Sequence, residues 1–165
     1  MNDKVRLIIT GGTIDNLDYD DEINEPVGQK SLIPGLLNQA RTTFEYEIEE
    51  LMMKDSRFVG EKERLRILKA CENSPENKIV ITHGTMTMPD TAKFLGKQKI
   101  NKTIILTGAM KPANKDKSDA LFNLGTAIAA VQTLPNGVYI TMHGKIFAWD
   151  NVKKNMEKKR FENIK

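Results

Sequence analysis

The sequence of 165 residues contains one cysteine, Cys71, so no disulfide bond can form within the chain. This excludes the disulfide-stapled folds of small secreted proteins and favours a reducing compartment. Long apolar runs are also missing, which excludes a membrane-spanning helix. Residues 1–10 carry charges too early for a signal peptide. We therefore expect a cytoplasmic protein that has no membrane partner.

An excess of one charge is missing as well. The chain has 25 basic and 22 acidic side chains, and this net charge of +3 is too small to indicate nucleic-acid binding. Residues 151–165 hold six basic and two acidic groups, so the basic excess lies in a C-terminal tail. Two readings of this tail stay open. It is either a helix or arm that joins copies of the chain, or a frayed, solvated end.

What the sequence does contain is a regular alternation of apolar runs and amphipathic segments. Hydrophobic residues make up 39% of a chain long enough to bury a core, so we expect a single domain over residues 1–165. The expected strands are residues 5–10, 44–52, 78–82, 102–107, 138–142 and 146–149, and the expected helices are residues 31–41, 60–72, 89–96 and 119–133. Such alternation predicts an α/β fold with a doubly wound, mostly parallel sheet and helices on both faces. Within these elements we expect Tyr46 and Leu65 to face the core.

Residues 15–30 do not follow this pattern. Six acidic residues and no basic residue lie between Asp15 and Glu25, directly after the first strand. We do not expect this segment to pack as a core strand or helix. Long loops in compact domains are often functional, so a lid over a site and a solvated acidic loop both remain open.

Candidate chemistry follows the strands, because ligands of doubly wound sheets bind beyond the carboxyl ends of the strands. The first strand is followed by Gly11-Gly12-Thr13 and the third by Gly84-Thr85. Each places a hydroxyl beside a backbone that a ligand can approach, and glycine N–H groups can meet an oxyanion. A threonine nucleophile needs a base. The candidates for that base are Lys54, Lys111, Lys153, Lys154, His83 and His143.

Several other site types have no signal in this sequence. There is no phosphate-binding Gly-Lys-Ser/Thr, no GxGxxG and no GxSxG. The two histidines stand in neither an HExxH nor a CxxC setting. We therefore expect neither a metal nor a cofactor.

Six segments together resemble the L-asparaginase/glutaminase family of amidohydrolases. They are TGGTI at 10–14, KDS at 54–56, HGTMTM at 83–88, TGAMKP at 107–112, SDALFNLGTAI at 118–128 and DNVKKN at 150–155. They run nearly from end to end in the family's order. The sequence looks like a short, single-domain branch of the family that lacks the C-terminal domain. The resemblance implies the family's doubly wound α/β fold.

The resemblance also implies a reaction, the hydrolysis of the side-chain amide of L-asparagine to L-aspartate and ammonia through a threonine acyl-enzyme. Thr13 would be the nucleophile, and Thr85 would position the attacking group or the water. Lys154 would raise the basicity of these hydroxyls. Asp55 and Ser56 would hold the α-carboxylate and α-amino ends of the substrate.

The remaining implied residues surround the reacting amide. Gly12, Gly84 and Met86 would contact the substrate, with backbone N–H groups near Gly12 and Met86 forming the oxyanion hole. Tyr19 is the candidate lid residue. Since the family's second domain helps to close the site in a dimer, the resemblance implies a homo-oligomer.

One residue departs from the family pattern. Where the family has HGTDTM, this chain has Met86 in place of an aspartate that binds the substrate's α-amino group and joins the lysine relay. A thioether has no charge and accepts hydrogen bonds weakly, so it can do neither. Asp90, Asp119 and the acidic loop are the candidates to replace this acid. Three readings stay open: an asparaginase, an amidase for another small amide, and an amino-acid-binding homologue without activity.

Overall fold

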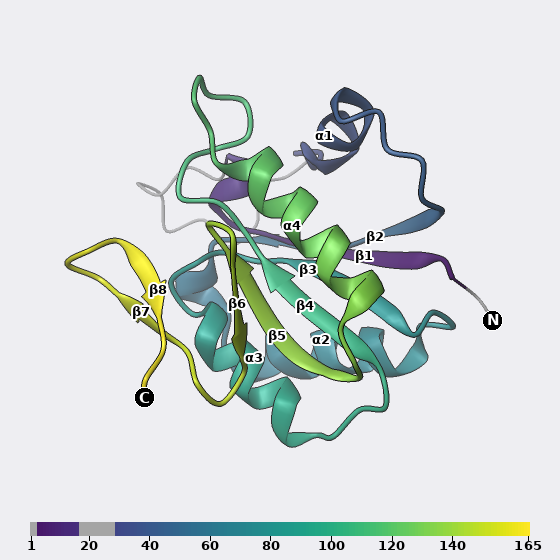
Figure 1. Ribbon diagram of the computed structural model, residues 1–165, viewed down its shortest axis with the longest axis vertical. Coiled ribbons are helices and arrows are strands. Elements are labelled where there is room, and N and C mark those ends of the chain that lie inside the picture. Colours follow the sequence, from purple (N-terminus) through teal and green to yellow (C-terminus); the bar gives the residue numbers. More distant parts are fainter. Residues whose placement is uncertain (1–2, 17–28) are drawn as a thin grey trace.

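The fold is built on one six-stranded sheet, shown in Figure 1, in a computed structural model that describes residues 3–16 and 29–165. The strands are β1 (Val5–Gly11), β2 (Tyr46–Lys54), β3 (Lys78–Thr82), β4 (Thr103–Thr107), β5 (Gly137–Met142) and β6 (Lys145–Ala148), in the spatial order β2-β1-β3-β4-β5-β6. All neighbours are parallel except β5 and β6, which form an antiparallel hairpin. The predicted α/β fold with a mostly parallel sheet is confirmed.

Four helices cover the two faces of the sheet: α1 (Ile33–Gln39), α2 (Glu61–Asn73), α3 (Met88–Lys97) and α4 (Ala120–Thr133). Apolar residues of α1 and α4 share a core with Leu7 and Ile9. Residues of α2 and α3 share a core with Ile8 on the opposite face. Successive side chains of a strand point to opposite faces, so the continuous apolar run in β1 feeds both cores.

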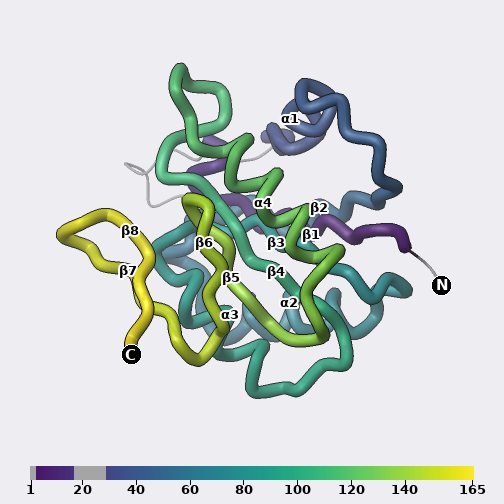
Figure 2. The backbone as a smooth tube through the Cα atoms, viewed as in Figure 1, coloured from purple at the N-terminus to yellow at the C-terminus, as the bar shows by residue number. Residues whose placement is uncertain are grey.

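The connection through α4 has an unusual hand. Both α3 and α4 join a strand to the next strand in the same direction across the sheet, yet they lie on opposite faces (Figures 1 and 2). Two such crossovers must differ in hand, whereas nearly all βαβ connections are right-handed. As a result, the β4–α4 loop lies on the α1 face, where the N–H of Ala113 donates to the Ile14 carbonyl at 3.2 Å.

The strand order places a ligand site between β1 and β3. From β1 the chain moves outward to β2 and then returns past β1 to β3, so the direction of winding changes there. In open α/β sheets, the crevice at such a switch point binds ligands at the carboxyl ends of the strands. The loops beyond β1 and β3 are the two that carry Gly12-Thr13 and Gly84-Thr85.

Two expected core positions are wrong. Tyr46 is 36% exposed because it begins the edge strand β2, which pairs only with β1. Leu65 is 44% exposed because α2 buries a stripe through Ile67, Ala70 and Cys71, which is offset from the stripe that we expected.

The basic C-terminal segment is neither a helix nor a frayed end. It forms a hairpin of β7 (Lys153–Asn155) and β8 (Arg160–Glu162), which projects from the sheet in Figure 1. Phe161 anchors this hairpin, since its side chain is buried and its ring centroid lies 6.4 Å from that of Phe147 on β6. One buried aromatic side chain therefore fixes this segment, which its basic composition did not indicate.

The start of the expected acidic loop is part of the core. Asp15 is fully buried in a 3₁₀ turn (Thr13–Asp15), contrary to our expectation for this segment. Its Oδ1 accepts hydrogen bonds from Ser31 Oγ and the Leu32 N–H at 2.8 and 2.7 Å, and burial raises the pKa of this carboxyl. The proposed lid residue Tyr19 and most of residues 15–30 lie outside the described residues. None of the helices in the described part of the chain is long and apolar enough to span a bilayer.

Candidate functional site

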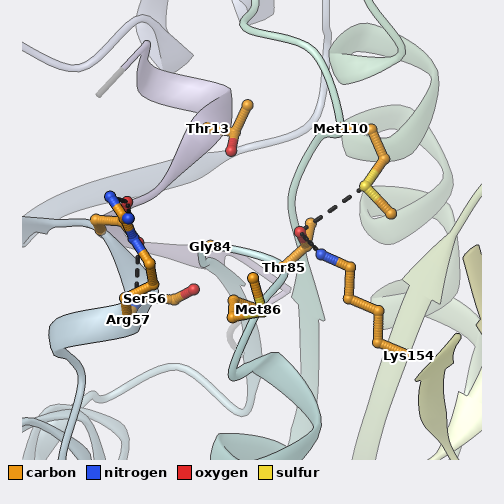
Figure 3. Close-up of a pocket in the computed structure, with 9 residues that line it drawn as sticks. Thr13, Ser56, Arg57, Gly84, Thr85, Met86, Met110 and Lys154 are labelled. Atoms are coloured by element: carbon orange, nitrogen blue, oxygen red, sulfur yellow. Dashed lines mark hydrogen bonds and ion pairs between the residues drawn. The ribbon is translucent and has the colours of Figure 1, made fainter. Parts of the chain in front are cut away.

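A pocket of about 290 Å³ lies at the carboxyl ends of β1 and β3. It is lined by Thr13, Asp55, Ser56, Arg57, Gly84, Thr85, Met86, Met110 and Lys154. Seven of these are residues that the sequence indicated, and they come from four separate segments of the chain. Figure 3 shows the Thr13 hydroxyl pointing toward the side of the pocket that holds Ser56 and Thr85. The pocket has the size of a small-molecule site.

Close backbone contacts bring these segments together. Gly12 has φ 88° and ψ −173°, a conformation that is essentially restricted to glycine. A Cβ atom on Gly12 would lie 2.4 Å from the Cα of Gly84, and one on Gly84 would lie 2.6 Å from the Cβ of Ser56. The loops after β1, β3 and β2 therefore stack without side chains between them. Both glycines are needed to place Thr13, Thr85 and Ser56 around one space.

Lys154 enters the pocket from the C-terminal hairpin. Its Nζ donates to Thr85 Oγ1 at 2.8 Å, the contact drawn in Figure 3. Among the described residues, no carboxylate lies within ion-pair distance of this ammonium group. Burial lowers the pKa of Lys154, because no opposite charge compensates for the loss of hydration. The pair thus consists of a hydroxyl and an amine that is more easily neutralised than an exposed lysine.

The hairpin distinguishes Lys154 from its neighbour. Adjacent residues of a strand point to opposite sides, and here Lys153 is exposed while Lys154 is partly buried. Lys154 pairs across the hairpin with Phe161, the residue that anchors the hairpin. The side chains of Phe161 and Lys154 therefore lie on the same face of the hairpin.

The second loop of the pocket contains an internal ion pair. Arg57 donates to Asp55 from its backbone N–H at 2.9 Å and from Nε at 3.0 Å, and its guanidinium also pairs with Asp55 at 2.9 Å. Ser56 lies between these two residues in the sequence and is buried. Its carbonyl accepts a hydrogen bond from Thr87 Oγ1 at 2.8 Å. The Asp55 carboxylate thus already has several donors from Arg57 before any ligand binds.

The β4–α4 loop forms the wall opposite to this ion pair. Asp119 holds the loop, because its carboxylate accepts from the Met110 and Lys111 N–H groups at 3.0 Å and from His143 Nε2 at 2.7 Å. These backbone donors help to lower the pKa of Asp119 against the effect of burial. Met110 is thereby fixed so that its Sδ accepts from the Thr85 hydroxyl at 3.8 Å. Asp119 is consequently engaged away from Lys154, and it does not replace the missing acid.

His83 does not have the properties of a base. The ring is fully buried, with Nδ1 2.7 Å from the Gly84 carbonyl and Nε2 3.0 Å from Thr91 Oγ1. Burial lowers the pKa of His83 to about 4, so the imidazole is neutral at pH 7 and supports the Gly84 loop. Lys54 is held by Glu63 at 2.7 Å and His143 by Asp119. Of the six candidate bases, Lys154 is the one that lines the pocket.

The expected oxyanion hole uses backbone N–H groups near Gly12 and Met86, and Gly12 itself does not supply one of them. The Gly12 N–H donates to the Lys54 carbonyl at 2.9 Å and is therefore not available to a ligand. Thr13 is the first residue of the 3₁₀ turn, and the first N–H groups of a helix have no partner within it. The amides of Thr13 and Met86 are the donors that fit the expected role.

Arg57 and Met110 line the pocket but were not singled out as site residues. Arg57 directly follows the KDS segment, and Met110 lies within TGAMKP, so both were next to recognised motifs. Their side-chain directions depend on the Asp55 and Asp119 contacts, which a sequence does not reveal. In the described part of the chain, no group of three or more His, Cys, Asp or Glu side chains is arranged to hold a metal ion.

Comparison with known proteins gives one family. The family model described as asparaginase, N-terminal, matches residues 4–163. A glutaminase-asparaginase from Pseudomonas fluorescens biotype A is 34% identical over 93 residues, which are 54% of this chain and 26% of that protein. One component of a glutamyl-tRNA(Gln) amidotransferase from Methanococcus vannielii is 42% identical over 81 residues, 48% of this chain and 19% of that protein.

Solved structures show the same fold over nearly the whole chain. A probable cytoplasmic L-asparaginase from Campylobacter jejuni superposes with a TM-score of 0.82 at 30% identity, covering 97% of this chain and 52% of that one. A thermostable L-asparaginase from Thermococcus kodakarensis gives a TM-score of 0.80 at 25% identity, covering 98% of this chain and 51% of that one. The chain thus spans about half the length of these solved relatives and a smaller share of the curated ones.

Proposed function

This chain belongs to the asparaginase family, and we propose that it is an amidohydrolase that releases ammonia from the side-chain amide of an asparagine-type substrate. The single observation that supports this most is the meeting of Thr13, Thr85 and Lys154 in one pocket at the switch point of the sheet. Two hydroxyls and an amine of lowered pKa are the groups that acyl transfer through a threonine ester requires.

The first half of the proposed reaction forms the ester. Thr13 Oγ1 attacks the amide carbon while its proton is passed on to the amide nitrogen, and the carbonyl oxygen becomes an oxyanion that meets backbone N–H groups. The C–N bond then breaks as the nitrogen gains a proton, and ammonia departs. Losing one oxyanion donor typically costs about 3–4 kcal/mol of barrier, so the positions of the Thr13 and Met86 amides matter.

The second half returns the enzyme to its starting state. Water adds to the ester carbon, the bond to Thr13 Oγ1 breaks, and the product leaves as a carboxylic acid while Thr13 regains its proton. In its neutral form Lys154 can accept a proton from Thr85, which is 2.8 Å away, and Thr85 can in turn orient the water. Burial lowers the pKa of Lys154 and so increases the fraction of this neutral form.

An ammonia-release assay tests this function. The panel consists of L-asparagine, L-glutamine, succinamic acid and Nα-acetyl-L-asparagine, measured with the wild type, Thr13→Ala and Thr13→Ser. We expect release from at least one amide, loss of it in Thr13→Ala, and partial activity in Thr13→Ser, which keeps a hydroxyl. Unchanged turnover by Thr13→Ala refutes the nucleophile, and an inactive wild type on the whole panel refutes the function.

A second candidate function is favoured by one observation, the lack of a carboxylate beside Lys154 among the described residues. A homologue that binds an amino acid without hydrolysing it would also keep this pocket. It predicts stabilisation by asparagine or aspartate of about 3 kcal/mol at a hundredfold excess over Kd, without any ammonia. The homo-oligomer and the cytoplasmic location remain predictions.

A further inference from the structure

The pocket has a charge pattern that selects one end of a substrate and rejects another. Lys154 and Arg57 are basic residues that line it, and Asp55 is the only carboxylate among the described residues that do so. That carboxylate is already paired with Arg57 through the guanidinium and the backbone N–H. Among the described residues that line the pocket, a ligand ammonium group therefore finds no unpaired carboxylate.

Met86 adds to this selection. It lies centrally among the lining residues in Figure 3 and is 43% exposed, so its side chain is accessible to a ligand in the pocket. A second thioether, that of Met110, also lines the pocket and accepts from Thr85. Enclosing an ammonium group against two thioethers removes its water without providing strong acceptors, which is costly.

A second hollow of about 500 Å³ adjoins the pocket and shares Met86 and Lys154 with it. Much of its lining is apolar, from Pro89, Trp149, Val152, Met156 and Ile164. Met156 and Ile164 are each 55% exposed. Its remaining lining residues, Asp90, Asp150, Lys93 and Lys153, are charged and exposed, and none of them lines the first pocket. The apolar part of this hollow can therefore take an uncharged substituent.

Building on the proposed function, we infer that this site takes an asparagine-type ω-amide whose α-nitrogen carries no charge, either because it is acylated or because it is absent. The reacting amide lies toward Thr13 and Thr85, and the substrate carboxylate lies toward the loop that carries Ser56 and Arg57. An acyl group on the α-nitrogen passes over Met86 into the adjoining hollow. Met86 is then a residue that determines specificity for the α-nitrogen end of the substrate.

The test compares kcat/KM for three amides. Nα-acetyl-L-asparagine and succinamic acid carry no α-ammonium group, whereas L-asparagine does. We expect at least one of the two compounds without an α-ammonium group to exceed L-asparagine by about tenfold or more, the lower range of what a charge-assisted hydrogen bond contributes. If L-asparagine is hydrolysed as well as or better than both, the inference is overturned while the proposed function stands.

A charge introduced at Met86 gives the matched experiment. Met86→Asp should raise kcat/KM for L-asparagine relative to Nα-acetyl-L-asparagine by about tenfold. The control Phe122→Asp makes the same change at an apolar residue that is 61% exposed and lines neither hollow. It should leave the ratio unchanged. A ratio that does not move in Met86→Asp, or that moves equally in Phe122→Asp, contradicts the role of Met86.

Binding measurements test the preference for an uncharged α-nitrogen independently of whether the protein hydrolyses amides. If no amide on the panel is hydrolysed, the proposed function fails, but calorimetry with L-aspartate and Nα-acetyl-L-aspartate still measures the preference. Tighter binding of the acetylated compound supports an uncharged nitrogen. Tighter binding of L-aspartate overturns it.

Discussion

Replacing Gly12 by alanine tests the backbone contact on which the whole site is built. The backbone at Gly12, with φ 88° and ψ −173°, lies in a region that costs other residues about 1–3 kcal/mol. The new Cβ would also lie 2.4 Å from the backbone of Gly84, and overpacking of this kind costs about 1–3 kcal/mol. Together these give a loss of about 2–6 kcal/mol in the free energy of unfolding. At about 2–4 °C per kcal/mol for a chain of this size, Tm falls by at least about 4 °C.

Urea unfolding at constant pH measures this loss, and the ammonia assay measures its effect on the site. Gly125→Ala is the matched control, because Gly125 lies in α4 with nothing within 4 Å of an added Cβ. This control should gain about 0.5–1 kcal/mol, since alanine is the better helix former. Gly12→Ala with wild-type stability and wild-type activity would refute the close packing of the loops after β1 and β3.

Three further changes test individual groups. Lys154→Met should lower kcat by about 10²–10⁴-fold because it removes the base, and it should not lower stability because this ammonium group has no carboxylate partner among the described residues. The wild-type rate should rise with pH through the lowered pKa of Lys154. If Lys154→Met keeps the same rise of rate with pH, the titrating group is not Lys154. The pKa of His83 is about 4 in the folded protein and about 6.5 in the unfolded chain, so the unfolded chain binds the proton first as pH falls. The free energy of unfolding should therefore decrease by about 3 kcal/mol between pH 6.5 and pH 4. His83→Asn should lack this component in urea titrations across that range, and equal slopes would contradict it. The ion pair with Lys54 lowers the pKa of Glu63 to about 2, so the stabilisation from this carboxylate should be present above pH 4.5 and lost as pH falls toward 2. The free energy of unfolding of Glu63→Gln, measured at pH 7 and pH 3, should therefore differ most from that of the wild type at pH 7.

The sequence predicted the order of the elements because each strand is a short apolar run and each helix has a clear apolar stripe. All six strands of the sheet and all four helices lie close to the expected residues. The errors at Tyr46 and Leu65 arose where exposure depends on position in the fold. An edge strand and an offset helix face are set by neighbours that local periodicity does not include.

The candidate site was predictable as a set of residues but not as a set of contacts. The Thr-Gly motifs marked Thr13 and Thr85, and the strand order brought them to one switch point. The same motifs could not show that the Gly12 N–H is already bonded to Lys54 or that Asp119 is held by His143. Those contacts depend on loops that meet only after the chain has folded.

The basic C-terminal segment shows why composition alone failed. Six basic groups in residues 151–165 are typical of a solvated tail, yet this segment carries the pocket lysine. One buried side chain, Phe161, fixes the hairpin that presents Lys154. Single anchoring residues of this kind do not change a composition enough to be noticed.

The most direct measurement is the location of the covalent intermediate. Acid quenching during turnover of a hydrolysed amide, followed by trypsin digestion and mass spectrometry, separates the two threonines, because Thr13 falls in the peptide 7–30 and Thr85 in the peptide 79–93. Thr10, the other threonine of the first peptide, is buried with its hydroxyl donating to the Thr82 carbonyl, and fragment ions distinguish it from Thr13. The account predicts an acyl mass increment on Thr13. An increment on Thr85, or turnover with no increment on either peptide, would contradict it.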